Sequence, residues 1–191
     1  MSYVLRRSSQ WLRPTDTDAV LALEKTLEVP SPMCAIAAAE LRPDKGRKVL
    51  HDALRRFAGG GTVCYIRAAL AAALWQLAGE KEMRYLVDWF YGERVDLNPC
   101  TPQTQTFLEG VAGVRAPDDR KLVAQLIADP RFDKLDYQSL RSLVQTVDRW
   151  VKTPLLPTEE LYNSRYWRGE NVQGLAEWRR KLKESVPAWT K

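Results

Sequence analysis

Apolar residues recur along most of the chain at the three- and four-residue spacing of amphipathic α-helices. Leu70, Leu74 and Leu77 occupy the i, i+4 and i+7 positions of one helical face. The same spacing returns at two later places, which are Phe107, Val111 and Val114 and then Leu140, Val144 and Val147. No segment shows a convincing strand-like alternation of apolar and polar residues, so the pattern predicts an all-α protein.

Proline, glycine and charged turns divide this pattern into separate helices. Pro30 and Pro32 break the chain early, the AGGG segment of residues 58–61 breaks it again, and Pro130 follows another predicted helix end. The predicted helices are Asp16–Glu28, Pro32–Leu41, Asp44–Phe57, Thr62–Leu77, Glu80–Tyr91, Pro102–Val114, Pro117–Ala128, Tyr137–Val151 and Asn171–Glu184.

The predicted helices form pairs that repeat about every 36 residues. The segment LRPDKGRKVLHDAL, which starts at Leu41, aligns without a gap with LAGEKEMRYLVDWF, which starts at Leu77. The corresponding apolar positions are Leu50, Leu86 and Leu122, and Leu54, Phe90 and Leu126. A non-repeating helical bundle, in which leucines recur by chance, is the alternative interpretation.

Helix–turn–helix units of this length, with an alanine-rich first helix and charged residues in the turn, resemble HEAT-like repeats. The residues that carry the resemblance are AALAAALWQLAGEKEMRYLVDWF, residues 68–90, and their relatives within residues 31–151. The resemblance implies an α-solenoid whose curved surface binds another macromolecule.

We therefore expect a short α-solenoid of about three to four stacked antiparallel helix pairs, with capping segments at both ends. Residues 31–151 would hold the repeats, because a single helix pair cannot bury its apolar face alone. Residues 1–30 would form the N-terminal cap and residues 152–191 a C-terminal capping tail. Residues 1–191 would thus form a single helical-repeat domain.

Cysteine usage and hydropathy bear on the compartment. The three cysteines are Cys34, Cys64 and Cys100. This odd number without CxxC spacing argues against a disulfide framework and a structural zinc site. The most apolar stretch, Val63–Ala78, contains Arg67 and is too short to span a bilayer. We expect a cytoplasmic protein that does not contact membranes.

The positive charge of the chain is mild and divided between two regions. The formal net charge is +5, and residues 31–60 and 151–191 each sum to +3. A nucleic-acid-binding surface requires these regions to meet in space, and a solvated basic surface is the simpler interpretation. The candidate binding residues in the two regions are Arg47, Lys48, Arg55, Arg56, Trp167, Arg168, Trp178, Arg179 and Arg180.

The C-terminal tail interleaves aromatic and basic residues. Such residues can stack on bases and neutralise phosphates, or they can anchor a protein interface. Leu175, Trp178 and Leu182 share one helical face, however, and this favours packing of the tail onto the last repeat as a cap.

Catalytic chemistry is weakly indicated. The single histidine, His51, has no nucleophile elbow beside it, and the glycine run lacks the lysine of a phosphate-binding loop. No cluster has metal-ligand spacing. HEAT-like folds include DNA-repair glycosylases, so an aspartate facing a basic, aromatic groove, such as Asp148 beside Trp150, is a weaker enzymatic alternative.

These observations favour a non-catalytic scaffold that binds a protein partner through its curved helical surface. The alternative is a helical-repeat protein that binds nucleic acid with its basic residues and C-terminal tryptophans. We expect no cofactor, no metal and no catalytic residue, and nothing in the sequence indicates a small-molecule ligand.

Overall fold

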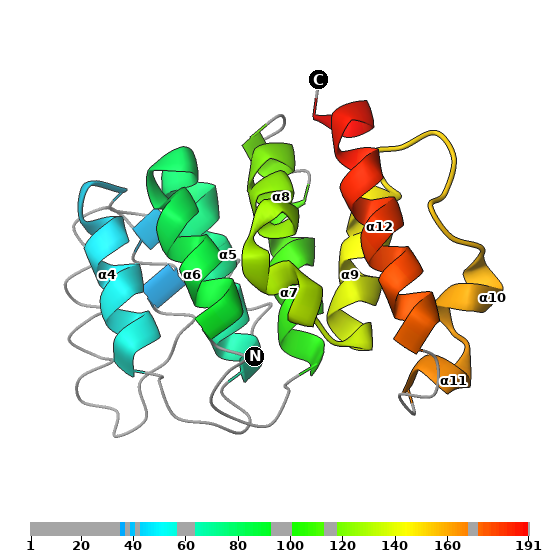
Figure 1. The fold of residues 1–191 in the computed structure, drawn as a ribbon. Helices are drawn as coiled ribbons and strands as arrows, with labels where there is room; N and C mark the ends of the chain where they lie inside the picture. The colour runs from blue at the N-terminus through cyan, green and yellow to red at the C-terminus, as the bar shows by residue number, and fades with distance from the viewer. Residues whose placement is uncertain are drawn as a thin grey trace. The chain divides into compact units, whose positions relative to one another are not determined.

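The computed structural model describes residues 35–36, 39–40, 43–56, 64–92, 101–112, 118–167 and 172–190. Within these ranges the regular structure is helical and no strand occurs, which confirms the predicted all-α class (Figure 1). The predicted helix Asp16–Glu28, the N-terminal cap of residues 1–30 and the AGGG segment of residues 58–61 lie outside the described residues.

The chain divides into two compact units, Met1–Glu82 and Met83–Lys191. In the first unit, helix α4 (Pro43–Arg56) packs along α5 (Cys64–Ala78), and α5 leads into the 3-10 helix η2 (Gly79–Glu82). The expected positions Leu50 and Leu54 of α4 are buried. The predicted one-domain organisation stays a prediction.

Two glycines shape the first unit. Gly46 lies within α4, where a Cβ atom would stand 2.6 Å from Cδ2 of Leu77 and 2.9 Å from the carbonyl oxygen of Ala39. Only glycine therefore lets the backbones approach this closely. Gly79 has a φ of 56°, the left-handed conformation that ends many helices, and it separates α5 from η2.

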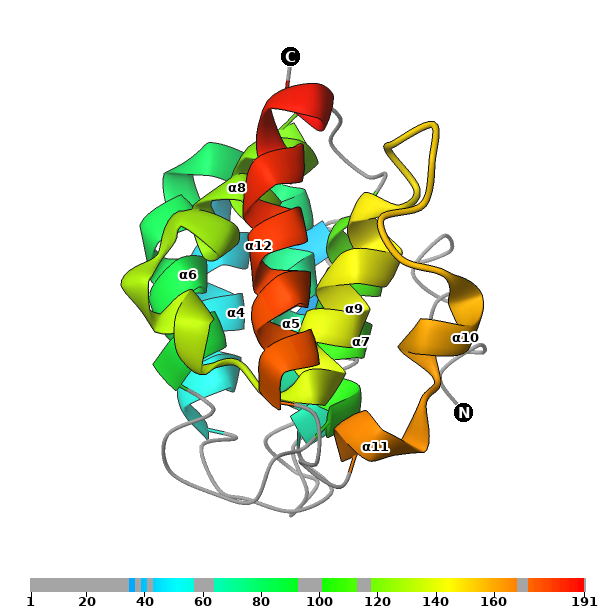
Figure 2. The ribbon, with the colours of Figure 1, turned by 45° about the vertical axis from the view of Figure 1, so that its right-hand side comes forward.

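The second unit contains five longer helices among its described residues. They are α6 (Met83–Gly92), α7 (Thr101–Val111), α8 (Asp118–Ala128), α9 (Tyr137–Val147) and α12 (Val172–Trp189). Helix α6 packs on α8, α7 packs on α9, and α12 packs on both α8 and α9 (Figure 2). The shorter elements are η3 (Pro130–Lys134), α10 (Thr158–Leu161) and α11 (Ser164–Trp167).

The apolar positions that repeat in the sequence form much of the core of this unit. The buried members are Leu86, Phe90, Phe107, Val111, Leu122, Leu126, Leu140, Val144 and Val147. Their burial confirms the predicted core faces of these helices. The stacking of helix pairs into a solenoid stays a prediction.

Helix α6 begins at Met83 rather than at the predicted Glu80, and α7 ends at Val111 rather than Val114. Two further predicted helix ends were wrong by four or more residues. Helix α9 ends at Val147 rather than Val151, because i→i−3 hydrogen bonds, from the Arg149 N–H to Thr146 and from the Trp150 N–H to Val147, replace the α-helical pattern there. The Asp148 carboxylate then accepts the backbone N–H of Leu155 at 2.8 Å. Helix α12 continues past Glu184 to Trp189, although Pro187 lies in its last turn. Burial of Trp189 against the unit stabilises this extension. Within the described residues, no helix combines the length and the apolar character that crossing a membrane requires.

Candidate functional site

The four basic candidates of the first unit all lie on α4 with exposed side chains. At least two of them form ion pairs within this unit. Arg47 pairs with Glu82, and Arg55 pairs with Asp52 one helical turn earlier. Lys48 and Arg56 also project from α4 into solvent. The helix therefore presents a basic face, part of whose charge is already compensated by carboxylates.

Glu82 is the centre of a polar cluster that ties η2 to α4. Its carboxylate is 3% exposed, accepts a hydrogen bond from Nε of Arg47 at 2.6 Å, and lies 3.0 Å from Nε2 of His51. A buried carboxylate requires such partners, because burying an unpaired charge is costly. The contact with His51 gives the single histidine of the chain a structural role.

Trp178, a candidate binding residue, is fully buried in the second unit. Its indole N–H donates to Oε1 of Glu160 at 3.0 Å, and the Tyr166 hydroxyl donates to the same oxygen at 3.0 Å. The Trp178 ring lies 4.8 Å from the Tyr166 ring and 5.6 Å from the Tyr137 ring, between centroids. Trp178 therefore packs α12 against α9 and α11, and its ring is not available at the surface.

The basic candidates that follow Trp178 on α12 are also engaged within the unit. Arg179 donates from Nη2 to the carbonyl oxygen of Leu135 at 2.7 Å. Arg180 is exposed and forms ion pairs with Glu177 and Glu184 of its own helix. The side chain of Trp167 and the whole of Arg168 lie outside the described residues.

The nine candidate residues lie in two units. Four belong to α4 of the first unit and the others to the second unit. The single basic surface that nucleic-acid binding requires stays a prediction.

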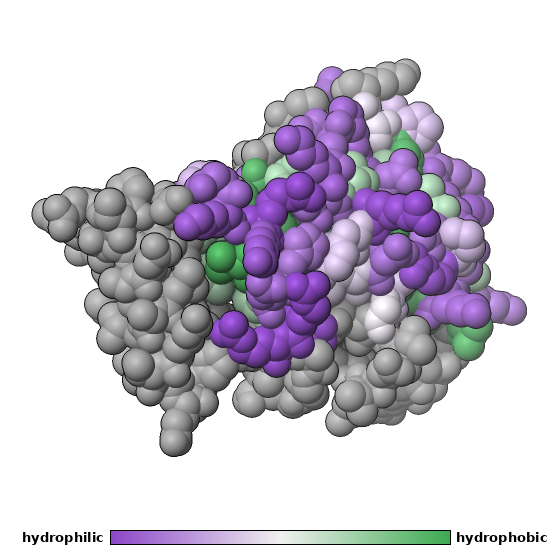
Figure 3. Space-filling model, turned by 90° about the vertical axis from the view of Figure 1, so that its left-hand side faces the viewer, coloured by the Kyte–Doolittle hydropathy of each residue, from purple (hydrophilic) through white to green (hydrophobic). Residues whose placement is uncertain are grey.

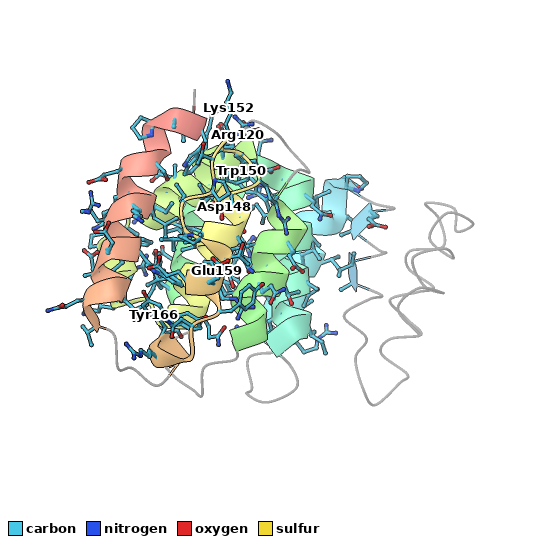
Figure 4. All side chains as sticks on the ribbon, turned by 90° about the vertical axis from the view of Figure 1, so that its right-hand side faces the viewer. Arg120, Asp148, Trp150, Lys152, Glu159 and Tyr166 are labelled. Carbon is cyan, nitrogen blue, oxygen red and sulfur yellow. The ribbon has the colours of Figure 1, made fainter. Side chains whose placement is uncertain are left out.

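Asp148 and Trp150, the residues of the enzymatic alternative, lie just beyond the end of α9. Figure 4 shows them toward the same end of the second unit as Arg120 and Lys152, with Glu159 and Tyr166 farther along. The Trp150 ring lies 5.3 Å from the buried ring of Trp189, and Arg120 donates from Nη1 to the Trp189 carbonyl oxygen at 3.0 Å. These contacts anchor the end of α12.

The carboxyl group of Asp148 has an unusual environment. Burial raises the pKa of this group above its ordinary value of 3.8, and the hydrogen bond from the Leu155 N–H opposes this effect. Asp148 thus carries a partly desolvated charge that holds the loop of residues 148–155 in place. Its observed contact is structural, and the enzymatic alternative stays a hypothesis.

Sequence reasoning missed an exposed aromatic residue on the second unit. Tyr162 follows α10, is 55% exposed, and lies under the guanidinium group of Arg141, whose Cζ is 4.7 Å from the ring centroid. Gln145 donates from Nε2 to the Tyr162 hydroxyl at 3.2 Å. Arg141 and Gln145 are four residues apart on the face of α9 that the apolar pattern leaves outside the core, and this spacing was the available signal.

Comparison with known proteins gave no match: no protein-family model, no curated protein and no solved structure matches this chain. Over the part of the chain that the structure describes, no three histidine, cysteine or acidic side chains gather as a metal site would require.

Proposed function

We propose that this protein is a non-catalytic scaffold of HEAT-like repeats that binds a protein partner through its curved helical surface. The proposal rests on two hydrogen-bonding contacts of the second unit that join residues the same number of positions apart in the sequence. The Tyr91 hydroxyl of α6 donates to the carbonyl of Leu126 on α8, 35 residues later. The hydroxyl oxygens of Thr104 on α7 and Ser139 on α9 are 3.4 Å apart, again 35 residues apart in sequence.

This constant separation supports stacked helix pairs. A repeat array brings the same helix of successive pairs into contact at a separation close to the repeat length. Helices α6 and α8 would then be the second members of two successive pairs, and α7 and α9 the first members. Helix α12 packs on both α8 and α9, as expected for a segment that closes such a stack.

The charge distribution favours a protein partner over nucleic acid. Arg131, Lys183 and Arg180 of the second unit each bind at least one carboxylate. A nucleic-acid-binding surface needs cations that are free to replace the counterions of phosphates, and neighbouring carboxylates repel those phosphates. Internally paired charges of this kind occur on the surfaces of many proteins that do not bind nucleic acid.

Large apolar side chains are rarely exposed among the described residues, and this favours a transient interface over a large permanent one. In the view of Figure 3, the described residues expose mainly hydrophilic atoms, and apolar atoms form only small patches. Among the described residues, Tyr162 and Val172 are the large apolar side chains with high exposure. Partner binding would then depend on a few anchoring side chains.

A pull-down from a lysate of the source cells tests the proposal. The full chain is immobilised, and the lysate is applied with and without nuclease at low and at moderate salt. We expect a protein partner that is retained after nuclease treatment and at moderate salt. Nucleic acid that is bound at low salt and released by moderate salt would instead support the alternative function.

A further inference from the structure

Two arginines of the second unit lie over tyrosine rings at the same distance but in opposite environments. Arg131 lies 4.7 Å from the ring centroid of Tyr91, and Arg141 lies 4.7 Å from that of Tyr162. Tyr91 is buried and 3% exposed, whereas Tyr162 is 55% exposed. Both pairs have cation–π geometry, and one of them is presented to solvent.

The charges of the two arginines are compensated differently. Arg131 binds Asp129 at 2.8 Å and Asp88 at 2.9 Å. Arg141 donates only a long hydrogen bond of 3.5 Å to the side-chain oxygen of Gln138, and no carboxylate binds it among the described residues. The guanidinium group of Arg141 therefore keeps N–H donors that match the two oxygens of a carboxylate.

The exposed pair is also held in place before any partner arrives. The hydrogen bond from Gln145 fixes the hydroxyl end of Tyr162, and the guanidinium group of Arg141 covers one face of the ring. A tyrosine fixed in this way loses little conformational entropy on binding. Tyrosine and arginine are also among the residues that contribute most to binding energy at protein interfaces.

We propose that Arg141 and Tyr162 form the anchor of the partner-binding surface, and that they bind a protein segment in which a carboxylate side chain neighbours an apolar one. The carboxylate would bind Arg141 as Asp129 binds Arg131, and the apolar side chain would pack on the exposed part of the Tyr162 ring. This inference rests on the proposed function and specifies where and what the scaffold binds.

The surroundings of the anchor favour a protein segment over a nucleic-acid strand. Glu159 is exposed in the short helix that precedes Tyr162, and Asp148 lies at the end of the helix that carries Arg141. A strand carries a phosphate at every nucleotide, so binding at Arg141 would bring further phosphates close to these carboxylates. A peptide can instead present one carboxylate between uncharged residues.

Photo-crosslinking tests the anchor in the full chain. The photoreactive residue p-benzoylphenylalanine replaces Thr158, an exposed position one helical turn before Tyr162, and in a control it replaces Gln125, an exposed position on α8. Source-cell lysate is treated with nuclease and irradiated, and the crosslinked peptides are sequenced by mass spectrometry. We expect crosslinks from position 158, but not from position 125, to protein segments in which Asp or Glu neighbours an apolar residue.

Three substitutions complete the test through the Kd of the captured partner. Arg141→Gln and Tyr162→Ala should each weaken binding by about tenfold or more. Arg131→Gln is the matched control, because it also removes an arginine that lies over a tyrosine ring. The charge of Arg131 is compensated within the unit by Asp88 and Asp129, so this variant should leave the Kd unchanged. Circular dichroism confirms that each variant is folded.

The outcomes separate this inference from the proposed function. If the wild type captures a protein that both anchor variants bind equally well, the anchor is wrong and the scaffold function stands. An equal loss on Arg131→Gln, or crosslinked segments without acidic residues, also overturns the anchor. If the wild type captures no protein, or only nucleic acid, both proposals fail.

Discussion

The buried carboxylate of Glu82 in η2 binds Arg47 of α4, which precedes it by 35 residues. The two side chains are unequally exposed, since that of Arg47 is 52% exposed and that of Glu82 is 3% exposed. The loss of one partner therefore leaves the other in a different environment. Arg47 can be hydrated where it stands, whereas Glu82 would stay buried with the contact to His51 still in place.

Loss of Arg47 should consequently destabilise the first unit. Arg47→Met keeps the aliphatic part of the side chain and leaves a buried carboxylate undercompensated, which costs about 2 kcal/mol of unfolding free energy. Urea denaturation followed by far-UV circular dichroism measures this effect. Lys48→Met, at the neighbouring exposed position, is the control and should change stability by less than about 0.5 kcal/mol. Equal stabilities of the two variants would contradict the role of Arg47.

Gly46 provides a test of helix packing in the same unit. Alanine normally stabilises a helix by about 1 kcal/mol relative to glycine. At position 46, however, the new methyl group would lie 2.6 Å from Leu77 and 2.9 Å from the backbone oxygen of Ala39, so we expect Gly46→Ala to destabilise by about 1–3 kcal/mol. The control is Gly92→Ala, where a Cβ atom meets nothing within 4 Å. Thermal unfolding should show opposite shifts for the two variants, and a stabilised Gly46→Ala would refute the close approach.

Trp178 is expected to stabilise the second unit rather than to bind a partner. Trp178→Ala would leave a cavity and cost about 3–5 kcal/mol. Trp178→Phe would keep most of the ring volume but lose the hydrogen bond to Glu160, and it should cost less. The Phe variant, if it stays folded, should bind the captured partner with an unchanged Kd. A weaker Kd without a loss of stability would return Trp178 to the binding residues.

The sequence predicted the features of the fold that depend on local periodicity along a helix. Burial of Leu140, Val144 and Val147 followed from their spacing, because a helix places such residues on one face wherever it packs. The start of α8 at Asp118 was also predictable to within one residue, since Pro117 favours a first helical turn.

The contacts that make up the anchor could not be predicted in this way. Arg141 and Tyr162 belong to different elements, and no helical period relates them. Their meeting depends on how the loop of residues 148–155 returns along α9, which is fixed in part by one hydrogen bond from Leu155 to Asp148. The end of α9 was mispredicted because no proline or glycine marks it, and the helix ends in backbone turns at residues 146–150.

Asp129 should make the protein more stable at neutral than at acidic pH. Its carboxylate accepts hydrogen bonds from the side chain and backbone of Arg131, and these lower its pKa below the ordinary value of 3.8. The stabilisation is therefore present above about pH 4 and is lost as the pH falls through the lowered pKa. Asp129→Asn should cost about 1 kcal/mol near pH 7. Urea midpoints for variant and wild type should converge at low pH, and a gap that persists there would indicate a non-ionic cause.

Asp148 should behave in the opposite way. Burial raises its pKa above 3.8, so its ionised form opposes folding, and the contribution of this group to stability declines as the pH rises through the raised pKa. Asp148→Asn keeps an acceptor for the Leu155 N–H and removes the charge. The variant should therefore be more stable than the wild type near pH 7, and the gain should vanish below about pH 3.8.

Thermal unfolding of the Asp148→Asn and Asp129→Asn variants across this pH range tests whether the two substitutions change stability in opposite directions. A variant at Asp148 that is less stable than the wild type at neutral pH would mean that the charge is compensated by groups other than the Leu155 amide. A gain in the stability of Asp148→Asn at neutral pH would mean that the ionised carboxylate destabilises the fold. A carboxylate that destabilises the fold is expected where activity or binding requires it. The enzymatic alternative of Asp148 beside Trp150 would then merit a direct assay, with Asp148→Asn as a folded and more stable control.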